Sequence, residues 1–248
     1  MAMAEAIAIE RFEPRMIRRL RTLFPQHTSA LRKSGVRRCV RFGIERARVY
    51  GITNPGLLRV YILLMFLFGS RFDTDPLYPW AVRILREGSP LDSCARINRL
   101  QAEALDYLSV VHGPNNCFIT NALEKLRDVA LSSLSHSLER RFEQTALDLL
   151  AEIHPQRCTY LGQEPLLQML RRSRDQANQL RIGTPKGIAL TAGLILTVGH
   201  GWSQDPLYPW LSSDLEWCES SAQRVNSLHR RVKRYLRLLL NYQNKTIA

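Results

Sequence analysis

The six residues DPLYPW occur twice in this chain, at 75–80 and again at 205–210. A constant shift of 130 residues around this hexapeptide aligns residues 11–85 with 141–215 without a gap. The identical pairs include Phe12 with Phe142, Glu13 with Glu143, Arg41 with Arg171, Pro55 with Pro185 and Gly69 with Gly199. After a two-residue deletion the match resumes at a shift of 128, where Arg96, Asn98 and Tyr107 face Arg224, Asn226 and Tyr235. The pattern predicts a tandem duplication of a module of about 100 residues, which is longer than a solenoid repeat.

Helix signals recur at matching places in both copies. Asn54-Pro55 and Thr184-Pro185 each place a capping side chain before a proline, and Gly69 and Gly199 end the apolar runs that follow. Further helices are expected at about 12–24, 34–50 and 92–111 and at their counterparts 142–153, 165–180 and 220–242, with short helices beginning at Pro79 and Pro209. No stretch shows the alternation of a strand. We therefore expect an all-α fold with a basic first repeat at 1–111, a linker and connecting helix at 112–139, and a second repeat at 140–248 that ends in a basic helix.

Composition points to a globular protein that stays in the cytoplasm. The chain has 248 residues, of which 45% are apolar. Its first nine residues lack the basic and apolar regions of a signal peptide, and its longest apolar run, 60–68, is far shorter than the roughly 20 residues of a membrane span. Five cysteines without CxxC spacing are typical of reduced thiols. We expect no disulfide, no metal, no cofactor and no membrane span.

The repeated hexapeptide has two readings. Asp73 and Asp75 in the first copy resemble part of a calcium loop, but such loops need about six oxygen ligands and the second copy has Ser203 in place of Asp73. The structural reading is preferred. Aspartates that precede rigid prolines accept backbone N–H bonds in tight turns, and tryptophans supply large apolar anchors. The expected structural residues are Asp75, Pro76 and Trp80 in the first copy, and Asp205, Pro206 and Trp210 in the second.

Signatures of catalysis are missing from the sequence. There is no GxSxG elbow, no HExxH, no P-loop and no dinucleotide-binding glycine fingerprint. The six histidines do not occupy equivalent positions in the two copies. We therefore expect a protein that is not an enzyme.

Charge is the strongest compositional signal, and it is unevenly distributed. The net charge is +13. Residues 11–85 carry 15 Lys and Arg against 4 Asp and Glu, whereas the aligned residues 141–215 carry 7 of each. A genome rich in GC favours arginine, and Arg outnumbers Lys 30 to 5 here, but such a bias does not explain the difference between aligned repeats.

The basic residues fall into stripes that are candidates for binding a partner. Clustered cations attract an acidic protein, a nucleic acid or an anionic lipid surface. No nucleic-acid reading module is present, which favours an acidic protein surface and leaves nucleic acid as an alternative. The candidate residues are Arg15, Arg18 and Arg19; Arg37, Arg38, Arg41 and Arg48; and Arg230, Arg234 and Arg237.

A family resemblance is carried by the first copy, in the runs RFGIERARVYGI at 41–52, YILLMFLFG at 61–69, FDTDP at 72–76 and PWA at 79–81. These resemble a family of bacterial helical proteins with an FDTDPxxPW signature, whose genes often lie beside type VI secretion genes for PAAR-tip proteins and effectors. The resemblance implies a non-enzymatic cytosolic accessory of toxin delivery. It is either an adaptor or chaperone for an effector or its PAAR tip protein, or an immunity protein. Toxins that attack nucleic acid tend to be basic, and a basic immunity protein would not match their charge, which favours the adaptor.

Overall fold

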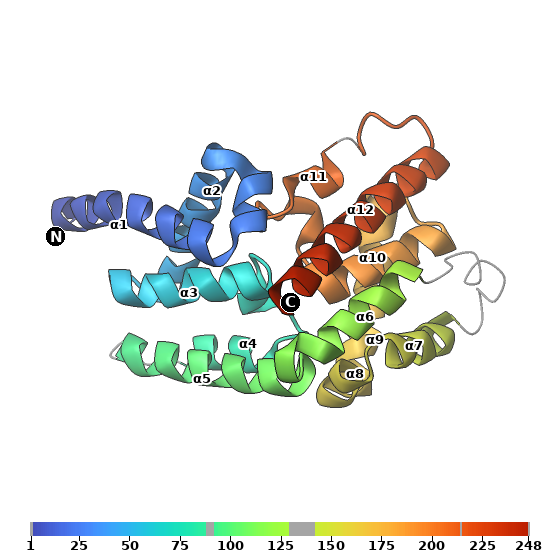
Figure 1. The fold of residues 1–248 in the computed structure, drawn as a ribbon, viewed down its shortest axis with the longest axis horizontal. Helices are drawn as coiled ribbons and strands as arrows, with labels where there is room; N and C mark the ends of the chain where they lie inside the picture. Colours follow the sequence, from blue (N-terminus) through green and yellow to red (C-terminus); the bar gives the residue numbers. More distant parts are fainter. Residues whose placement is uncertain (1, 88–91, 129–141, 214, 248) are drawn as a thin grey trace. The chain divides into compact units, whose positions relative to one another are not determined.

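The computed structural model describes residues 2–87, 92–128, 142–213 and 215–247; of residues 2–8, 142 and 242–247 it describes the backbone alone. Over these ranges the chain forms helices joined by turns and contains no strand, as Figure 1 shows. The predicted all-α class is therefore confirmed.

The chain folds into two compact units that are not contiguous in sequence. Unit 1 comprises residues 1–104 together with 201–209, and unit 2 comprises 105–200 together with 210–248. The sequence alignment assigns 201–209 to the second repeat, whereas the structure groups this segment with the first. The described part of the expected linker forms a helix of unit 2, and its residues 129–139 lie outside the described ranges.

Unit 1 is built on one very apolar helix. Its elements are α1 (Ala2–Leu23), α2 (Pro25–Arg48), α3 (Pro55–Phe68), η1 (Phe72–Thr74), α4 (Pro79–Arg86), the first part of α5 (Ser93–Val111) and η5 (Trp202–Gln204). Helices α1 and α2 both pack on α3, whose Tyr61, Ile62 and Met65 are fully buried. At Gly43 of α2 a Cβ atom would lie 2.8 Å from Cγ1 of Ile62, so glycine is what permits the close approach of α2 to α3.

Unit 2 contains the rest of α5, η3 (Pro114–Asn116), α6 (Cys117–Asp128), α7 (Phe142–Ile153), α8 (Pro155–Leu161), α9 (Gln163–Gln179), α10 (Pro185–Val198) and α12 (Ser221–Ile247). The short helix α11 (Pro209–Ser212) begins at the junction of the units. Helix α6, which has no counterpart in unit 1, packs against α12 through Leu123, Leu236 and Leu240.

Two short helical segments escaped the sequence analysis. Pro25 and Pro155 end α1 and α7 as expected, but each also begins a helix at once, because proline has the φ angle of the first helical position and needs no N–H partner there. The helix expected from residue 34 therefore begins at Pro25 and kinks at Arg32, where φ is 55°. In the second copy the same kink separates α8 from α9 at Gly162, where φ is 73°.

Local geometry repeats at the aligned positions. Asn54 accepts from the Gly56 amide and Thr184 from the Gly187 amide, and φ is 98° at Gly69 and 99° at Gly199. Arg96 donates to the Leu85 carbonyl at 3.4 Å, and its counterpart Arg224 donates to the Leu215 carbonyl at 2.9 Å. The duplication remains an inference from sequence. The aligned positions share their backbone conformation and the arginine–carbonyl bond, while the two caps accept from amides two and three residues on.

The segment 201–209 is held in unit 1 by buried polar contacts. Both carboxylate oxygens of Asp205 accept amide hydrogens, from Ser70 at 3.0 Å and from Leu207 at 2.8 Å. The Cys39 thiol donates to the Pro206 carbonyl, with 3.2 Å between sulfur and oxygen. The ring of Tyr208 lies 5.2 Å from that of His27. Burial raises the pKa of Asp205 above its usual range, and the two amide bonds oppose that shift.

We predict that Glu13 matters more to stability than its counterpart Glu143. The Glu13 side chain is 11% exposed and pairs with Arg37 at 2.5 Å and Arg41 at 3.0 Å, whereas Glu143 is 42% exposed and pairs with Arg171 at 3.8 Å. An exposed pair contributes little, whereas the nearly buried Glu13 carboxylate is paired with two guanidinium groups and a neutral amide cannot replace that interaction. Glu13→Gln should therefore cost about 1–3 kcal/mol. Glu143→Gln should cost under about 0.5 kcal/mol. Urea unfolding followed by circular dichroism measures both, and equal losses would contradict the prediction.

We also predict that unit 1 loses stability in mild acid through His27. Burial lowers the pKa of His27 to about 4 from its ordinary 6.5. The folded protein therefore disfavours the protonated form of His27, whereas the unfolded chain is protonated there below about pH 6.5. The stability contributed by neutral His27 is complete above pH 6.5 and declines as the pH falls towards 4. The full effect is on the order of 3 kcal/mol.

The measurement is the free energy of unfolding at several pH values between 7 and 4. His112 and His154 in unit 2 have pKa values lowered to about 4 in the same way, and Asp205 acts in the opposite direction. His27→Phe isolates one contribution, because its stability should fall less steeply with pH than that of the unchanged chain. Identical slopes would show that His27 is not the acid-sensitive group.

Candidate anion-binding groove

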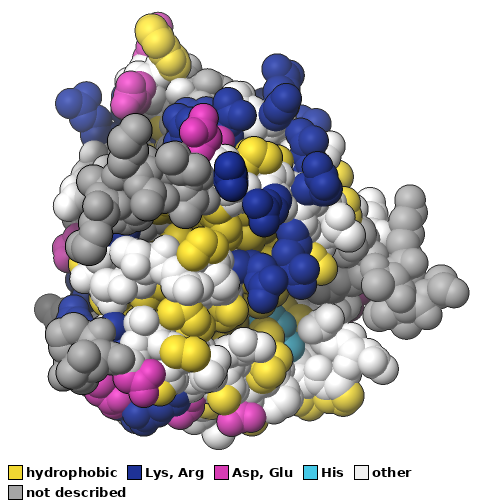
Figure 2. Space-filling model, turned by 90° about the vertical axis from the view of Figure 1, so that its left-hand side faces the viewer, with side chains coloured by type: hydrophobic (Ala, Val, Ile, Leu, Met, Phe, Trp, Pro, Cys, Tyr) yellow, Lys and Arg dark blue, Asp and Glu magenta, His cyan; other side chains and the backbone are white. Residues whose placement is uncertain are grey.

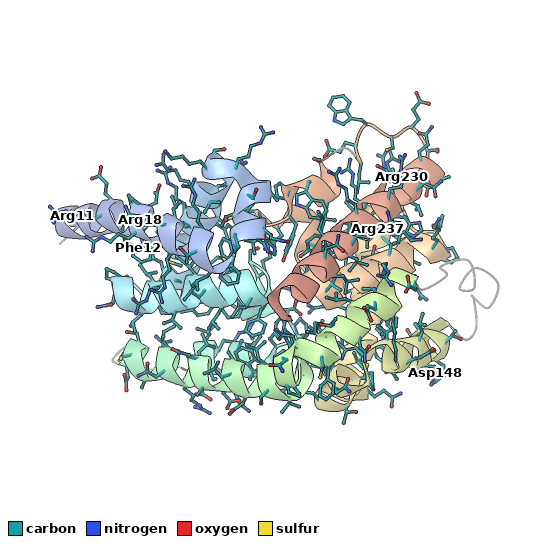
Figure 3. All side chains as sticks on the ribbon, in the orientation of Figure 1. Arg11, Phe12, Arg18, Asp148, Arg230 and Arg237 are labelled. Atoms are coloured by element: carbon teal, nitrogen blue, oxygen red, sulfur yellow. The ribbon has the colours of Figure 1, made fainter. Side chains whose placement is uncertain are left out.

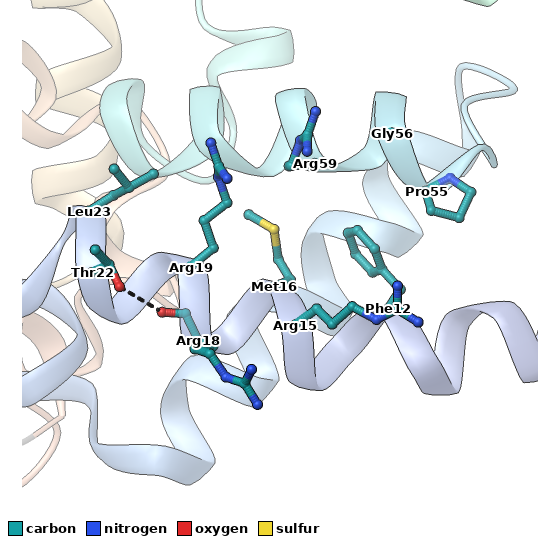
Figure 4. Close-up of a pocket in the computed structure, with 10 residues that line it drawn as sticks. All are labelled: Phe12, Arg15, Met16, Arg18, Arg19, Thr22, Leu23, Pro55, Gly56 and Arg59. Atoms are coloured by element: carbon teal, nitrogen blue, oxygen red, sulfur yellow. Dashed lines mark hydrogen bonds between the residues drawn. The ribbon is translucent and has the colours of Figure 1, made fainter.

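A groove of about 560 Å³ runs between α1 and α3 in unit 1. Its floor is apolar: Phe12 and Met16 are buried, and Leu23 at one end is 47% exposed. Figure 4 shows Met16 and Arg19 extending from α1 towards α3, with Phe12 and Pro55 at the opposite end from Leu23. Residue numbers rise in the same direction along both helices, so two parallel helices form the walls.

Four arginines border this floor. Arg15, Arg18 and Arg19 project from α1, and Arg59 lies on α3. All four are exposed, and no described acidic side chain forms an ion pair with any of them. The N-terminal turn of α3, at Pro55 and Gly56, forms one end of the groove and adds the positive end of a helix dipole. These four guanidinium groups, none of them paired with a described acidic side chain, attract negative charge together with the N-terminal turn of α3.

The aligned positions of the second copy lack these cations. Arg15 is replaced by Thr145, Arg18 by Asp148, Arg19 by Leu149 and Arg59 by Ala189. Figure 3 labels one such pair, Arg18 on α1 and Asp148 on α7. Because α7 and α10 form with none of these arginines, the helices do not require them. In Figure 2, which shows the side on which α1 and α3 begin, Lys and Arg side chains gather beside exposed hydrophobic ones.

The arginine stripe expected on α2 has a different environment. Arg37 and Arg41 both pair with Glu13 of α1, so their charges are partly neutralised and join α1 to α2. Arg38 and Arg48 are exposed on α2 and do not line the groove. The two stripes therefore form different surfaces. On α2, Arg37 and Arg41 join α2 to α1, whereas on α1 Arg15, Arg18 and Arg19 border the groove.

The third expected stripe lies on α12 in unit 2. Arg230, Arg234 and Arg237 are exposed, and Figure 3 labels the first and last of them. Arg230 borders a hollow of about 660 Å³ beside Trp217, whose side chain is 83% exposed. The neighbouring Arg231 instead donates to the Trp210 carbonyl at 2.7 Å. This stripe belongs to unit 2, whereas the groove belongs to unit 1.

The hexapeptide residues have structural roles. Asp75 and Asp205 each accept the amide hydrogen two residues later, at 2.9 Å and 2.8 Å, across Pro76 and Pro206. Trp80 is buried with its ring 5.6 Å from that of Phe68, joining α4 to α3. Trp210 is partly exposed and its ring lies 5.1 Å from that of Tyr235 on α12.

Asp73, which the sequence offered as a possible cation ligand, is bound by side chains of the protein. It is buried, forms an ion pair with Arg46, and accepts the Tyr50 hydroxyl at 2.9 Å. Burial and the charge of Asp73 raise the pKa of Tyr50 to about 12. In the second copy Gln176, Leu180 and Ser203 replace Arg46, Tyr50 and Asp73. The second copy therefore cannot form this cluster, which stabilises unit 1.

Arg59 is the groove residue that the sequence analysis missed. It is the single charged residue of the helix PGLLRVYILLMFLF at 55–68, and a lone charge in such a helix must face solvent. That signal was present in the sequence. What it could not show is that Arg59 lines a groove between α3 and α1, because that depends on how the two helices pack.

Over the described ranges, no group of three or more His, Cys, Asp and Glu side chains is placed to hold a metal ion. None of the described helices has both the length and the apolar character needed to cross a membrane. Compared with protein-family models, with curated proteins and with solved structures, the chain shows no match.

The groove arginines should be dispensable for folding. The double variant Arg15→Thr and Arg59→Ala introduces the residues that the second copy carries and removes repulsion between like charges. We expect the free energy of unfolding to stay within about 0.5 kcal/mol of the unchanged chain, or to rise slightly. Urea unfolding at pH 7 checks this. A loss of more than about 1.5 kcal/mol would assign the arginines to the fold instead of to a site.

Proposed function

We propose that this chain is a non-enzymatic binding protein that holds an acidic segment of a partner protein in the groove between α1 and α3. One observation carries the proposal: four exposed arginines surround an apolar floor in the first copy, and the aligned helices of the second copy have none of them. Since like charges repel, four unpaired arginines are a cost to the free chain that an anionic partner removes.

The apolar floor favours a protein over a nucleic acid as the partner. Binding to phosphate groups needs exposed cations but no apolar surface, whereas protein–protein interfaces combine buried apolar contacts with arginine. Leu23 and Pro55 are exposed at the two ends of the groove, over the buried side chains of Phe12 and Met16, and provide apolar surface beside the arginines. The pairing of Arg37 and Arg41 with Glu13 also reduces the continuous basic surface that a nucleic acid backbone would follow.

The family resemblance supplies the setting of the proposal. A cytoplasmic adaptor or chaperone of type VI secretion would hold an effector or its PAAR tip protein before loading. In that role the groove of unit 1 binds an acidic region of the cargo. Immunity towards a toxin and binding of nucleic acid are the competing functions, and the experiment below separates them.

The test begins with purified chain and the effector or PAAR-tip protein encoded beside it. We expect a complex by calorimetry whose affinity falls at least tenfold in Arg15→Thr/Arg59→Ala and falls with rising salt. The matched control is Arg21→Ala/Arg38→Gln, which removes two exposed arginines outside the groove and also introduces the residues of the second copy. The control should bind as the unchanged chain does.

Function in cells then separates the alternatives. Deletion of the chain should reduce export of the effector, and its co-expression should leave the toxicity of the effector in a non-immune host unchanged. Protection of the host without an effect on export would overturn the adaptor in favour of immunity. Retention of DNA or RNA at about 50 mM salt, lost in the groove variant and unaccompanied by protein binding, would favour nucleic acid.

A further inference from the structure

The shape of the groove specifies the conformation of its ligand. The floor residues Phe12, Met16 and Leu23 extend over about three helical turns of α1, roughly 16 Å at the helical rise. The two walls are helices, α1 and α3, and run in the same direction (Figure 4). A third helix laid over two others places its side-chain ridge in the groove between them, which is the common way in which helices pack.

The charges lie on both sides of the floor. Arg15 and Arg19 stand on the α1 wall and Arg59 on the α3 wall, with Met16 between them. A complementary ligand needs an apolar stripe with acidic side chains on each flank. An amphipathic helix has this arrangement, since its apolar positions recur every three to four residues and its flanking positions lie on either side. A strand presents alternate faces and offers one row of side chains to the groove.

The far end of the groove is apolar as well as open. Leu23 of α1, which forms this end of the groove, is 47% exposed. Arg18 and Arg19 lie near Leu23, whereas Arg15 lies nearer to the end formed by Phe12 and Pro55, so the arginines extend along the groove (Figure 4). The ligand helix should therefore carry acidic side chains along its length and a large apolar residue near Leu23.

We infer that the groove between α1 and α3 binds an acidic amphipathic α-helix of about three to four turns, which lays its apolar stripe along the floor between the exposed Pro55 and Leu23 and pairs its carboxylates with Arg15, Arg19 and Arg59. The inference rests on the proposed function and narrows its ligand to one conformation and one pattern. The arginines set the selectivity and the association rate, and the exposed apolar side chains at the two ends of the groove add to the affinity.

The test uses fluorescein-labelled peptides of about 15 residues and measures Kd by fluorescence anisotropy. The first peptide is stapled as a helix, with leucines at helical spacing and glutamates on both flanks. The second has the same composition in a scrambled order without an apolar stripe, the third has the first sequence with a central proline and no staple, and the fourth carries lysines in place of the glutamates. Each is titrated into the unchanged chain, Arg15→Thr/Arg59→Ala and Arg21→Ala/Arg38→Gln.

We expect the stapled acidic helix to bind at least tenfold more tightly than the other three peptides. The groove variant should lose at least tenfold in affinity for it, and the matched control should lose less than twofold. Circular dichroism of both variants confirms that each is folded before the comparison is made.

The other outcomes separate failure of this inference from failure of the proposed function. Equal binding of the stapled, scrambled and proline peptides, lost in the groove variant, would overturn the helical ligand and leave an acidic polypeptide site. No binding of any acidic peptide, together with an unchanged affinity of the groove variant for the cargo protein, would overturn both. Sedimentation with phosphatidylglycerol vesicles through the same arginines, without peptide binding, would assign the groove to an anionic lipid surface.

Discussion

The burial of Asp205 in unit 1 is the constraint on which the rest of the structure depends. A carboxylate removed from water must have its oxygens satisfied, and the amides of Ser70 and Leu207 do this. The acceptor for the Ser70 amide is 135 residues away in sequence. Unit 1 is therefore complete only when 201–209 has reached it, and neither sequence repeat is a self-contained folding unit.

The two copies serve as controls for each other. Bonds at aligned positions, such as those of Arg96 and Arg224, mark what this helical arrangement requires. Differences between the copies mark what it does not require. By this comparison the groove arginines are not needed for the fold. Glu13 and Arg41 are part of the fold, because Glu143 and Arg171 form the corresponding ion pair in the second copy. The comparison makes the groove a candidate site even though no relative is available to indicate one.

Sequence reasoning predicted the helices well where local chemistry is strong. Asn54-Pro55 and Gly69 bound α3, and the Asp75 turn forms through the amide two residues on. It failed just after the helices expected at about 12–24 and 142–153, because Pro25 and Pro155 each begin a helix that the sequence analysis did not expect. Within the candidate site it identified Arg15, Arg18 and Arg19, but it expected the same partner-binding role for Arg37 and Arg41, which bind Glu13.

The sequence by itself determined the all-α class, the capping of the helices and the unequal charge of the aligned repeats, because caps, turns and composition act over a few neighbouring residues. Only the tertiary structure decided that Arg59 lines the same groove as Arg15, Arg18 and Arg19. It also decided that Asp73 is bound by Arg46 and Tyr50, and that 201–209 belongs to unit 1. Those outcomes depend on packing between segments far apart in the chain, where the rotation of a helix and the need to satisfy buried polar groups select one arrangement among many that local patterns allow.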